Sequence, residues 1–223
     1  MVKISFIGHS AFKITGETYS LLIDPFITGN PVAAYSDLKA DDILLTHAHG
    51  DHLGDSIEIA KNTGAQITAI FELANYCTEK GVKAQGVNIG GKVPFPWGSA
   101  YWLPAAHSSG TPDGRYGGVP ASILINIDGK SIYHAGDTGL HYDMKMIGEF
   151  YKPQIAMLPI GGFYTMGINE AVRAAQWLDC NKIIPMHYDT FPPIKTDPEE
   201  FKAELEAIGK ECIILKPGQK VEI

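Results

Sequence analysis

Short apolar runs along this chain are separated by turn-forming residues, a pattern typical of strands joined by tight loops. Residues 2–7 alternate between apolar and polar positions, as expected of a strand. Later runs are shorter and are bounded by glycine, proline, asparagine or aspartate. We predict strands at 2–7, 12–14, 20–23, 43–45, 67–70, 100–103, 122–127, 131–134, 155–158, 183–185 and 213–215.

Five further stretches predict helices. The last begins after Asp197, a residue type that caps helix N-termini, and Pro198 suits the first turn. Strand hairpins therefore come first along the chain, and alternating strands and helices follow them. The helices are expected at 55–62, 73–80, 144–151, 168–178 and 198–208.

This order of elements occurs twice. Asp24 and Asp137 each end a predicted strand and lie 113 positions apart (137 − 24), and Thr46 and Pro159 repeat that offset (159 − 46). Chance is the alternative, because only two elements share the offset. Two related halves would each form a sheet with one face against the other sheet and one face under helices. We therefore predict a four-layer α/β/β/α sandwich, with residues 1–223 as a single domain.

Composition and charge restrict the possible partners. Hydrophobic residues make up 45 % of the chain and charged residues 19 %, which is enough apolar material for a buried core. The formal net charge is -7, and no stretch rich in lysine and arginine offers a counter-charge to a phosphate backbone. A long nucleic acid is therefore not expected as a partner.

The expected location is the cytoplasm. Cys77, Cys180 and Cys212 are widely spaced and form no Cys-x-x-Cys motif, which fits reduced thiols. The chain shows no basic start followed by an apolar segment, as an export signal requires. The most apolar long window, 155–168, contains a proline and three glycines and is shorter than the roughly 18 residues that a membrane span needs. We expect no membrane span.

The strongest chemical signal is the segment Thr46-His47-Ala48-His49-Gly50-Asp51-His52, directly after the strand at 43–45. Three imidazoles and a carboxylate therefore crowd the end of one strand. Neutral imidazole nitrogen and carboxylate oxygen suit zinc and similar divalent ions, and a loop can turn alternate residues toward two neighbouring ions. The alternative is a polar surface turn, which this spacing does not favour.

The His-x-His-x-Asp-His pattern resembles the signature of the metallo-β-lactamase superfamily, whose fold is the doubled α/β/β/α sandwich. The resemblance covers nearly the whole chain, and it implies three later metal ligands, each in a loop after a strand. By this resemblance one ion would be held by three histidines, a second ion by an aspartate and two histidines, and one aspartate would bridge them. The first set is His47, His49 and His107, the second is Asp51, His52 and His187, and the bridge is Asp137.

Some of these residues have structural alternatives. His107 is otherwise an ordinary loop histidine, and Asp137 a helix cap or turn former. His187 is a stronger candidate, because Met186-His187-Tyr188 closes a strand where small polar residues are usual. Asp24 has no counterpart in the family's ligand pattern, so it either orients a ligand imidazole or loop, or simply forms a turn.

A closer resemblance comes from Gly8-His9-Ser10-Ala11-Phe12, Leu22-Ile23-Asp24-Pro25 and Pro159-Ile160-Gly161-Gly162. These segments resemble a branch of small metal-dependent hydrolases related to an ascorbate-phosphate lactonase and to a phospholipase D for N-acylphosphatidylethanolamine. His9 is either an active-site group or a histidine that satisfies the hairpin backbone. We take His9 and Asp51 as the candidate catalytic residues, with His9 expected not to be a primary metal ligand.

The resemblance implies a hydrolase in which two divalent ions activate water against a small ester, lactone or phosphodiester. Zinc is the first expectation, and manganese, iron or nickel also suit these ligands. A non-catalytic metal-binding sensor or scaffold and a di-iron redox protein are the alternatives. The expected partner is a small molecule, while the oligomeric state is not readable. Three more hydroxyl side chains lie near the predicted metal loops, and each either contacts the substrate or has a structural role. They are Tyr164, Tyr188 and Thr190.

Overall fold

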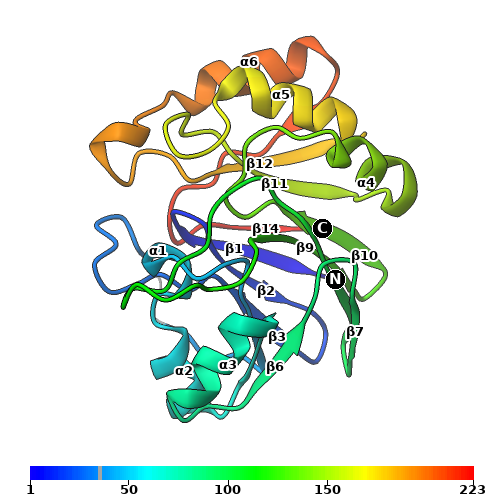
Figure 1. Cartoon of the computed structure of the whole chain (residues 1–223). Helices are drawn as coiled ribbons and strands as arrows, with labels where there is room; N and C mark the ends of the chain where they lie inside the picture. The colour runs from blue at the N-terminus through cyan, green and yellow to red at the C-terminus, as the bar shows by residue number, and fades with distance from the viewer. Residues whose placement is uncertain (35–36) are drawn as a thin grey trace.

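Two seven-stranded sheets lie face to face in the computed structural model, which describes residues 1–34 and 37–223. Helices cover the outer face of each sheet, as Figure 1 shows. The four-layer α/β/β/α sandwich predicted from the sequence is thereby confirmed.

The first sheet combines hairpins with parallel strands. Its order is β14-β1-β2-β3-β4-β5-β6, antiparallel from β14 to β3 and parallel from β3 to β6. The parallel strands run in the same direction, so their carboxyl ends lie at one edge of the sheet. The strands are β1 (Lys3–Gly8), β2 (Ala11–Thr15), β3 (Ser20–Ile23), β4 (Asp42–Leu44), β5 (Gln66–Ile70), β6 (Ala84–Val87) and β14 (Lys220–Glu222).

The second sheet repeats this arrangement. Its order is β13-β12-β11-β10-β9-β8-β7, antiparallel from β7 to β10 and parallel from β10 to β13. Strands β8–β13 therefore correspond to β1–β6 in order and direction, and β7 and β14 are additional edge strands. The strands are β7 (Lys92–Phe95), β8 (Gly98–Pro104), β9 (Ala121–Ile127), β10 (Lys130–His134), β11 (Ile155–Pro159), β12 (Lys182–Met186) and β13 (Glu211–Cys212).

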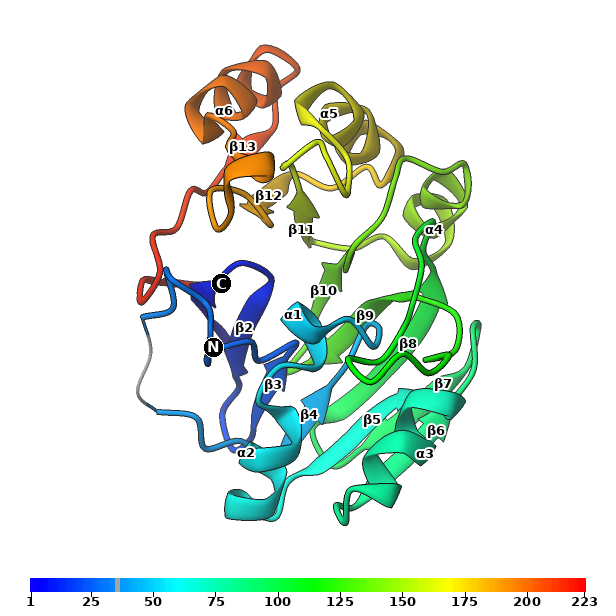
Figure 2. The same cartoon turned by 60° about the vertical axis from the view of Figure 1, so that its left-hand side comes forward.

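The helices form the two outer layers. Figure 2 shows α2 and α3 on the side of the first sheet and α4, α5 and α6 on the side of the second. The small helix α1 lies at the edge where both sets of parallel strands end. The helices are α1 (Gly50–Leu53), α2 (Ser56–Thr63), α3 (Phe71–Glu79), α4 (Asp143–Tyr151), α5 (Ile168–Trp177) and α6 (Pro198–Ala207), with a 3₁₀ turn at Pro192–Ile194.

Buried apolar residues form two clusters. The larger joins the inner faces of both sheets and continues under α4, α5 and α6, with Phe12, Trp102 and Phe201 fully buried. The smaller lies between the first sheet and α2 and α3, around Leu22 and Leu73. Because the larger cluster spans both sheets, the two halves are held together by their shared core.

The predicted elements agree with the observed ones except near the chain's edge strands. The helix starting after Asp197 is confirmed, with the Asp197 carboxylate accepting the backbone N–H of Glu199. The strand predicted at 213–215 is wrong, since β13 ends at Cys212 and the apolar run beyond it packs into the core through Leu215. Strands β6, β7 and β14 and the short α1 were not predicted. No helix among the described residues is long and apolar enough to cross a membrane.

Candidate metal centre

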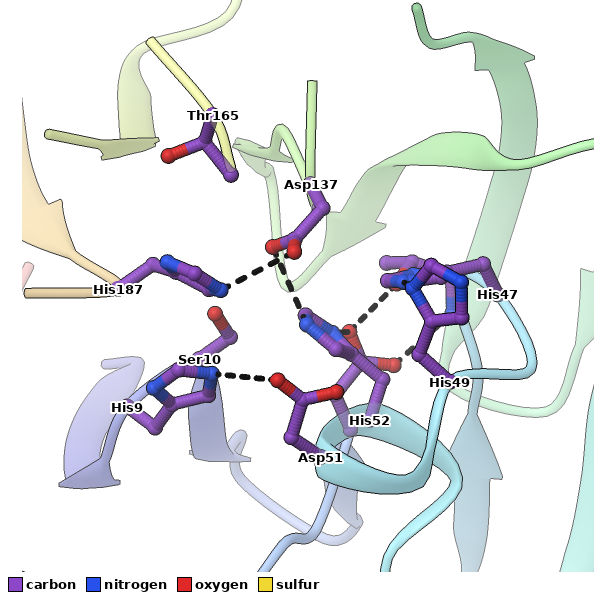
Figure 3. Close-up of polar contacts among 12 residues, drawn as sticks. His9, Ser10, His47, His49, Asp51, His52, Asp137, Thr165 and His187 are labelled. Carbon is purple, nitrogen blue, oxygen red and sulfur yellow. Dashed lines mark hydrogen bonds and ion pairs between the residues drawn. The ribbon is translucent and has the colours of Figure 1, made fainter. Parts of the chain in front are cut away.

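Seven side chains predicted as metal ligands lie together where the parallel strands of both sheets end. Figure 3 labels all of them except His107. The loop after β4 and the adjoining α1 carry those of the first half. Loops after β8, β10 and β12 carry those of the second half. The seven are His47, His49, Asp51, His52, His107, Asp137 and His187.

His47, His49 and His107 form one donor group. One ring nitrogen of each lies within 4.8 Å of the others. Nε2 of His47 is 2.9 Å from Nδ1 of His49, and both rings stand nearly perpendicular to that of His107. Such a convergence of three imidazole nitrogens is able to hold one divalent ion.

Asp51, His52 and His187 form a second donor group, together with His9. Asp137 lies between the two groups. Its carboxylate oxygens are 3.0 Å from Nε2 of His187, 3.1 Å from Nε2 of His52 and 3.6 Å from Nε2 of His107. It reaches His107 of the first group and both histidines of the second, in the place expected of a bridge, whereas Asp24 lies near His47 and His52 and meets Nδ1 of His52.

Close backbone contact between the halves places Asp137. The preceding Gly136 has a φ of 61°, and a Cβ there would lie 2.9 Å from the Cβ of Thr46. Only glycine combines this left-handed backbone with so close an approach. The Ala135-Gly136-Asp137 segment is therefore able to dock onto the loop that carries His47.

Asp24 orients the first-half histidines. Its carboxylate accepts the backbone N–H of Thr46 at 2.9 Å and the Thr46 hydroxyl at 2.6 Å. It also accepts Nδ1–H of His52 at 2.7 Å, so the neutral form of this imidazole has its lone pair at Nε2, toward Asp137. Because the Thr46 hydroxyl donates to Asp24, it accepts Nδ1–H of His47 at 3.0 Å and leaves that lone pair at Nε2. Of the two alternatives left open for Asp24, these bonds support the one in which it orients a candidate ligand.

His52 thus lies between two aspartates that occupy equivalent positions in the two halves. Asp24 follows β3 and binds Nδ1, whereas Asp137 follows the corresponding β10 and faces Nε2. The repeated strand order accounts for this symmetry. The two halves contribute one aspartate each to the same imidazole.

Several buried polar atoms around Asp137 have no hydrogen bond of good geometry among the described residues, although Nε2 of His52 and of His187 lie 3.1 and 3.0 Å from the Asp137 carboxylate. They are Nε2 of His52, both ring nitrogens of His187, and Oδ1 of Asp137. An unsatisfied buried polar group costs about 1–3 kcal/mol, so such a cluster requires an additional partner. Lone pairs on nitrogen and oxygen that converge in this way are the donors that zinc and similar ions bind. The residues therefore fit a metal.

The charge environment agrees with that fit. Burial disfavours the charged form of His52, but the Asp137 and Asp24 carboxylates outweigh burial and raise the pKa of this imidazole well above its usual value. Burial also favours the protonated form of Asp137, yet His52 and His187 hold its pKa well below the usual value. The two aspartates thus create a strong demand for positive charge beside Nε2 of His52, which a divalent cation is able to meet.

The other imidazoles are held in the neutral form that metal binding needs. Burial lowers the pKa of His47 well below its usual value, and it lowers those of His49 and His107 in the same direction. Their lone pairs therefore remain available near neutral pH.

His9 lies behind Asp51, in the turn between β1 and β2. Its Nε2 is 3.2 Å from the Asp51 carboxylate, its Nδ1 is 2.9 Å from the Thr190 hydroxyl, and its side chain has no exposed surface. Burial lowers its pKa to about 4. Its backbone carbonyl accepts the N–H of His187 at 2.8 Å, and both residues have positive φ, 60° and 54°. His9 therefore contacts the site through Asp51 and His187.

An open cleft of about 340 Å³ gives access to the donors. Tyr164 lines it, and so does Ser108, which sequence reasoning missed because no pattern marks a serine after a histidine. Of the other hydroxyls considered, Thr190 contacts His9, and Tyr188 lines a separate cavity beside His9, where burial raises its pKa to about 12. The remaining cleft residues are His49, Asp51, His107, Asp137 and His187.

Comparison with known proteins gives consistent matches. The beta-lactamase superfamily domain matches residues 3–187. The chain is 48 % identical over 229 residues to a UPF0173 metal-dependent hydrolase of Geobacillus thermodenitrificans, covering 100 % of both chains. It is 49 % identical over 229 residues to one of Thermococcus onnurineus, again covering 100 % of both. Among solved structures it is similar to Igni18, a metallo hydrolase of Ignicoccus hospitalis, with a TM-score of 0.91, 43 % identity, and coverage of 99 % of this chain and 97 % of that one.

Proposed function

Because this chain belongs to the beta-lactamase superfamily and to its UPF0173 metal-dependent hydrolases, we propose that it uses two divalent ions, zinc first among them, to hydrolyse a small ester, lactone or phosphodiester. The observation that carries the proposal is the convergence on Asp137 of buried nitrogen and oxygen donors that lack other partners. Manganese, iron and nickel suit the same donors.

In this proposal the donors divide into two sets that share Asp137. Supporting observations are the two separate donor groups and the Asp137 contacts to histidines of both. One set is His47, His49 and His107, and the other is Asp51, His52 and His187.

When bound, the ions would supply hydroxide near neutral pH and would polarise the carbonyl or phosphoryl oxygen under attack. The protein's own residues prepare the site for this chemistry. Asp24 fixes the rotation and the tautomers of His47 and His52, so their lone pairs point inward. Burial keeps His47, His49 and His107 neutral. The hydroxyls of Ser108 and Tyr164 line the cleft and are able to donate to a bound substrate.

His9, taken from the sequence as a candidate catalytic residue, is proposed instead as a positioning residue of the active site. Both of its nitrogens are within hydrogen-bond distance of protein groups, and its ring is fully buried, so it acts on the reacting groups through Asp51. Holding one carboxylate oxygen of Asp51 leaves the other in a defined direction. Asp51 itself lines the cleft and is proposed as both ligand and catalytic group.

An open cleft favours catalysis over a purely structural or sensing role. Closed structural metal sites surround each ion with protein ligands, whereas catalytic sites leave a position for water or substrate. Here five of the seven proposed ligands line a solvent-accessible cleft. We further propose that residues 1–223 form one domain, supported by the core shared between the sheets, and that the protein is cytoplasmic, supported by three buried free thiols.

Activity measurements on metal-analysed protein test the proposal. Protein purified without chelator would be assayed against lactones, thioesters and phosphodiesters, and His49→Ala would serve as the site variant. We expect hydrolysis in at least one class, loss of at least a hundredfold in His49→Ala, and unchanged activity in Cys77→Ala, a buried position outside the cleft. Equal rates in wild type and His49→Ala would contradict the proposal.

A further inference from the structure

The cleft combines its metal donors with neutral side chains. Besides the proposed ligands, only Ser108 and Tyr164 line it, and no lysine or arginine of the described residues does so. Arg115, in the loop that follows Ser108, is held elsewhere. Its guanidinium binds Glu79 at 2.6 Å and Asp113 at 3.3 Å and lies over the ring of Tyr76 on α3.

The balance of charge disfavours an anionic substrate. Two divalent ions would bring four positive charges, and the carboxylates of Asp24, Asp51 and Asp137 offset three of them. The attacking hydroxide offsets the fourth. A phosphodiester would add a negative charge that increases during the reaction, and metal ions, arginine or lysine stabilise such charge. Here the charge of the ions would already be offset, and the cleft offers no arginine or lysine among the described residues. An uncharged ester or lactone needs no such partner.

An exposed aromatic pair adjoins the donors. Tyr164 lines the cleft with 55 % of its surface exposed, and its hydroxyl has no hydrogen-bond partner in the described part of the chain. The ring of Phe163, 69 % exposed, packs edge-on against it with centroids 4.7 Å apart. Large apolar side chains grouped at the mouth of a site usually mark a surface that a ligand covers.

The loop that carries this pair is anchored beside the metal donors. The N–H of Met166 donates to the carbonyl of Thr138, the residue after Asp137, at 3.0 Å, and Gly162 N–H donates to Met166 at 3.0 Å. Gly161 packs so closely that a Cβ there would clash with the carbonyl oxygen of His187. Tyr164 is therefore held at a defined place relative to Asp137 and His187.

We propose that the cleft accepts an uncharged carboxylic ester or lactone with an apolar body, and that Tyr164, supported by Phe163, is the surface against which this body packs. This inference rests on the proposed hydrolase function and narrows its substrate class. Burying one methylene contributes up to about fourfold in affinity. Catalytic efficiency should therefore rise with the length of the acyl chain.

A series of p-nitrophenyl esters from acetate to hexanoate, compared with bis(p-nitrophenyl) phosphate, tests the inference on metal-loaded protein. We expect kcat/KM to rise about two- to fourfold per methylene and the phosphodiester to be the poorest substrate. Tyr164→Ala should flatten the chain-length dependence through KM, whereas Tyr164→Phe should retain it. Phe150→Ala removes another exposed aromatic side chain, on α4 and outside the cleft, and should change nothing.

A binding measurement decides the inference independently of turnover. Ligand-detected NMR on the metal-loaded protein would compare hexanamide with diethyl phosphate, and we expect hexanamide to bind more tightly in wild type and to weaken in Tyr164→Ala. Tighter binding of diethyl phosphate, or a hexanamide affinity unaffected by Tyr164→Ala, would overturn it. Absence of bound metal would instead refute the proposed function, so the two failures are distinguishable.

Discussion

Nε2–H of His134, at the end of β10, donates to the backbone carbonyl of Ser10 at 2.9 Å, and its Nδ1 accepts the N–H of Gly136 at 3.1 Å. The imidazole is fully buried and joins the turn that carries His9 to the loop that carries Asp137. Both ring nitrogens therefore have partners within the protein. One uncharged side chain thus ties together a first-half turn and a second-half loop at the site.

His134 should make the folded protein sensitive to acid. Burial lowers its pKa below the ordinary value of about 6.5, so below that pH the unfolded chain takes up a proton that the folded chain does not. His134→Gln keeps a donor and an acceptor without the titration. The free energy of unfolding of the wild type should fall relative to that of the variant, by up to about 1.4 kcal/mol for each pH unit below pH 6.5. Denaturant unfolding at matched metal content measures it, and a difference independent of pH would contradict the assignment.

Asp24→Asn should weaken metal binding although Asp24 is fully buried and does not line the cleft. The amide of asparagine cannot accept from His52 and Thr46 as the carboxylate does, so both imidazole orientations loosen. Loss of such an orienting group typically costs tenfold to hundredfold in metal affinity, which competition with a chromophoric chelator would measure. Asp42→Asn is the matched control, since Asp42 is a buried carboxylate that accepts from Trp97 Nε1–H away from the site. Equal metal affinity in all three proteins would refute the role of Asp24.

Two divalent ions per chain are expected in protein purified without chelator. Asp137→Ala should reduce that number toward one, because a carboxylate shared by both ions would offset the repulsion between neighbouring cations. Elemental analysis and calorimetric titration measure the stoichiometry. A wild-type value of one or none after metal supplementation would rule out the paired site. Chelator treatment should abolish hydrolysis, and added metal should restore it.

His9→Asn tests the positioning of Asp51. Asparagine tolerates the left-handed backbone at this position, φ 60°, so the turn is retained while the contact with Asp51 is lost. We expect kcat to fall about tenfold to hundredfold, with the number of bound ions and the melting temperature close to wild type. Thr190→Val removes only the partner of Nδ1 and should have a smaller effect. A lower melting temperature with unchanged kcat would instead identify His9 as a structural hairpin residue.

Central elements could be predicted because their own residues specify them. The strand Ser20–Ile23 was predicted with its observed bounds, and the continuous apolar strands of the second sheet to within two residues, because burial on both faces leaves a clear signal. Edge strands carry no such signal. Lys92–Phe95 contains a proline and Lys220–Glu222 is exposed, so each is a strand only because a neighbour pairs with it.

Some residues of the candidate site could likewise be predicted from the sequence, and others could not. Residues 47–52 are recognisable because four donors fall within six positions of one loop. The contact of His9 with Asp51 and Thr190 joins residues 42 and 181 positions apart, so only the folded chain brings them together. Tyr164 and Ser108 are ordinary loop residues in sequence, and only the position of the cleft distinguishes them.

Because both halves contribute candidate metal donors, a chain cut between the halves would have its donors on two fragments. Cutting the loop at 88–91, between β6 and β7, would leave His47, His49, Asp51 and His52 on one fragment and His107, Asp137 and His187 on the other. The second fragment would also carry β14, which pairs with β1 of the first, so the fragments would share a strand ladder as well as a sheet interface. Neither fragment holds a complete donor set. Recovery of metal affinity would therefore report fragment complementation, and the fold is suited to a split reporter whose signal is a bound ion.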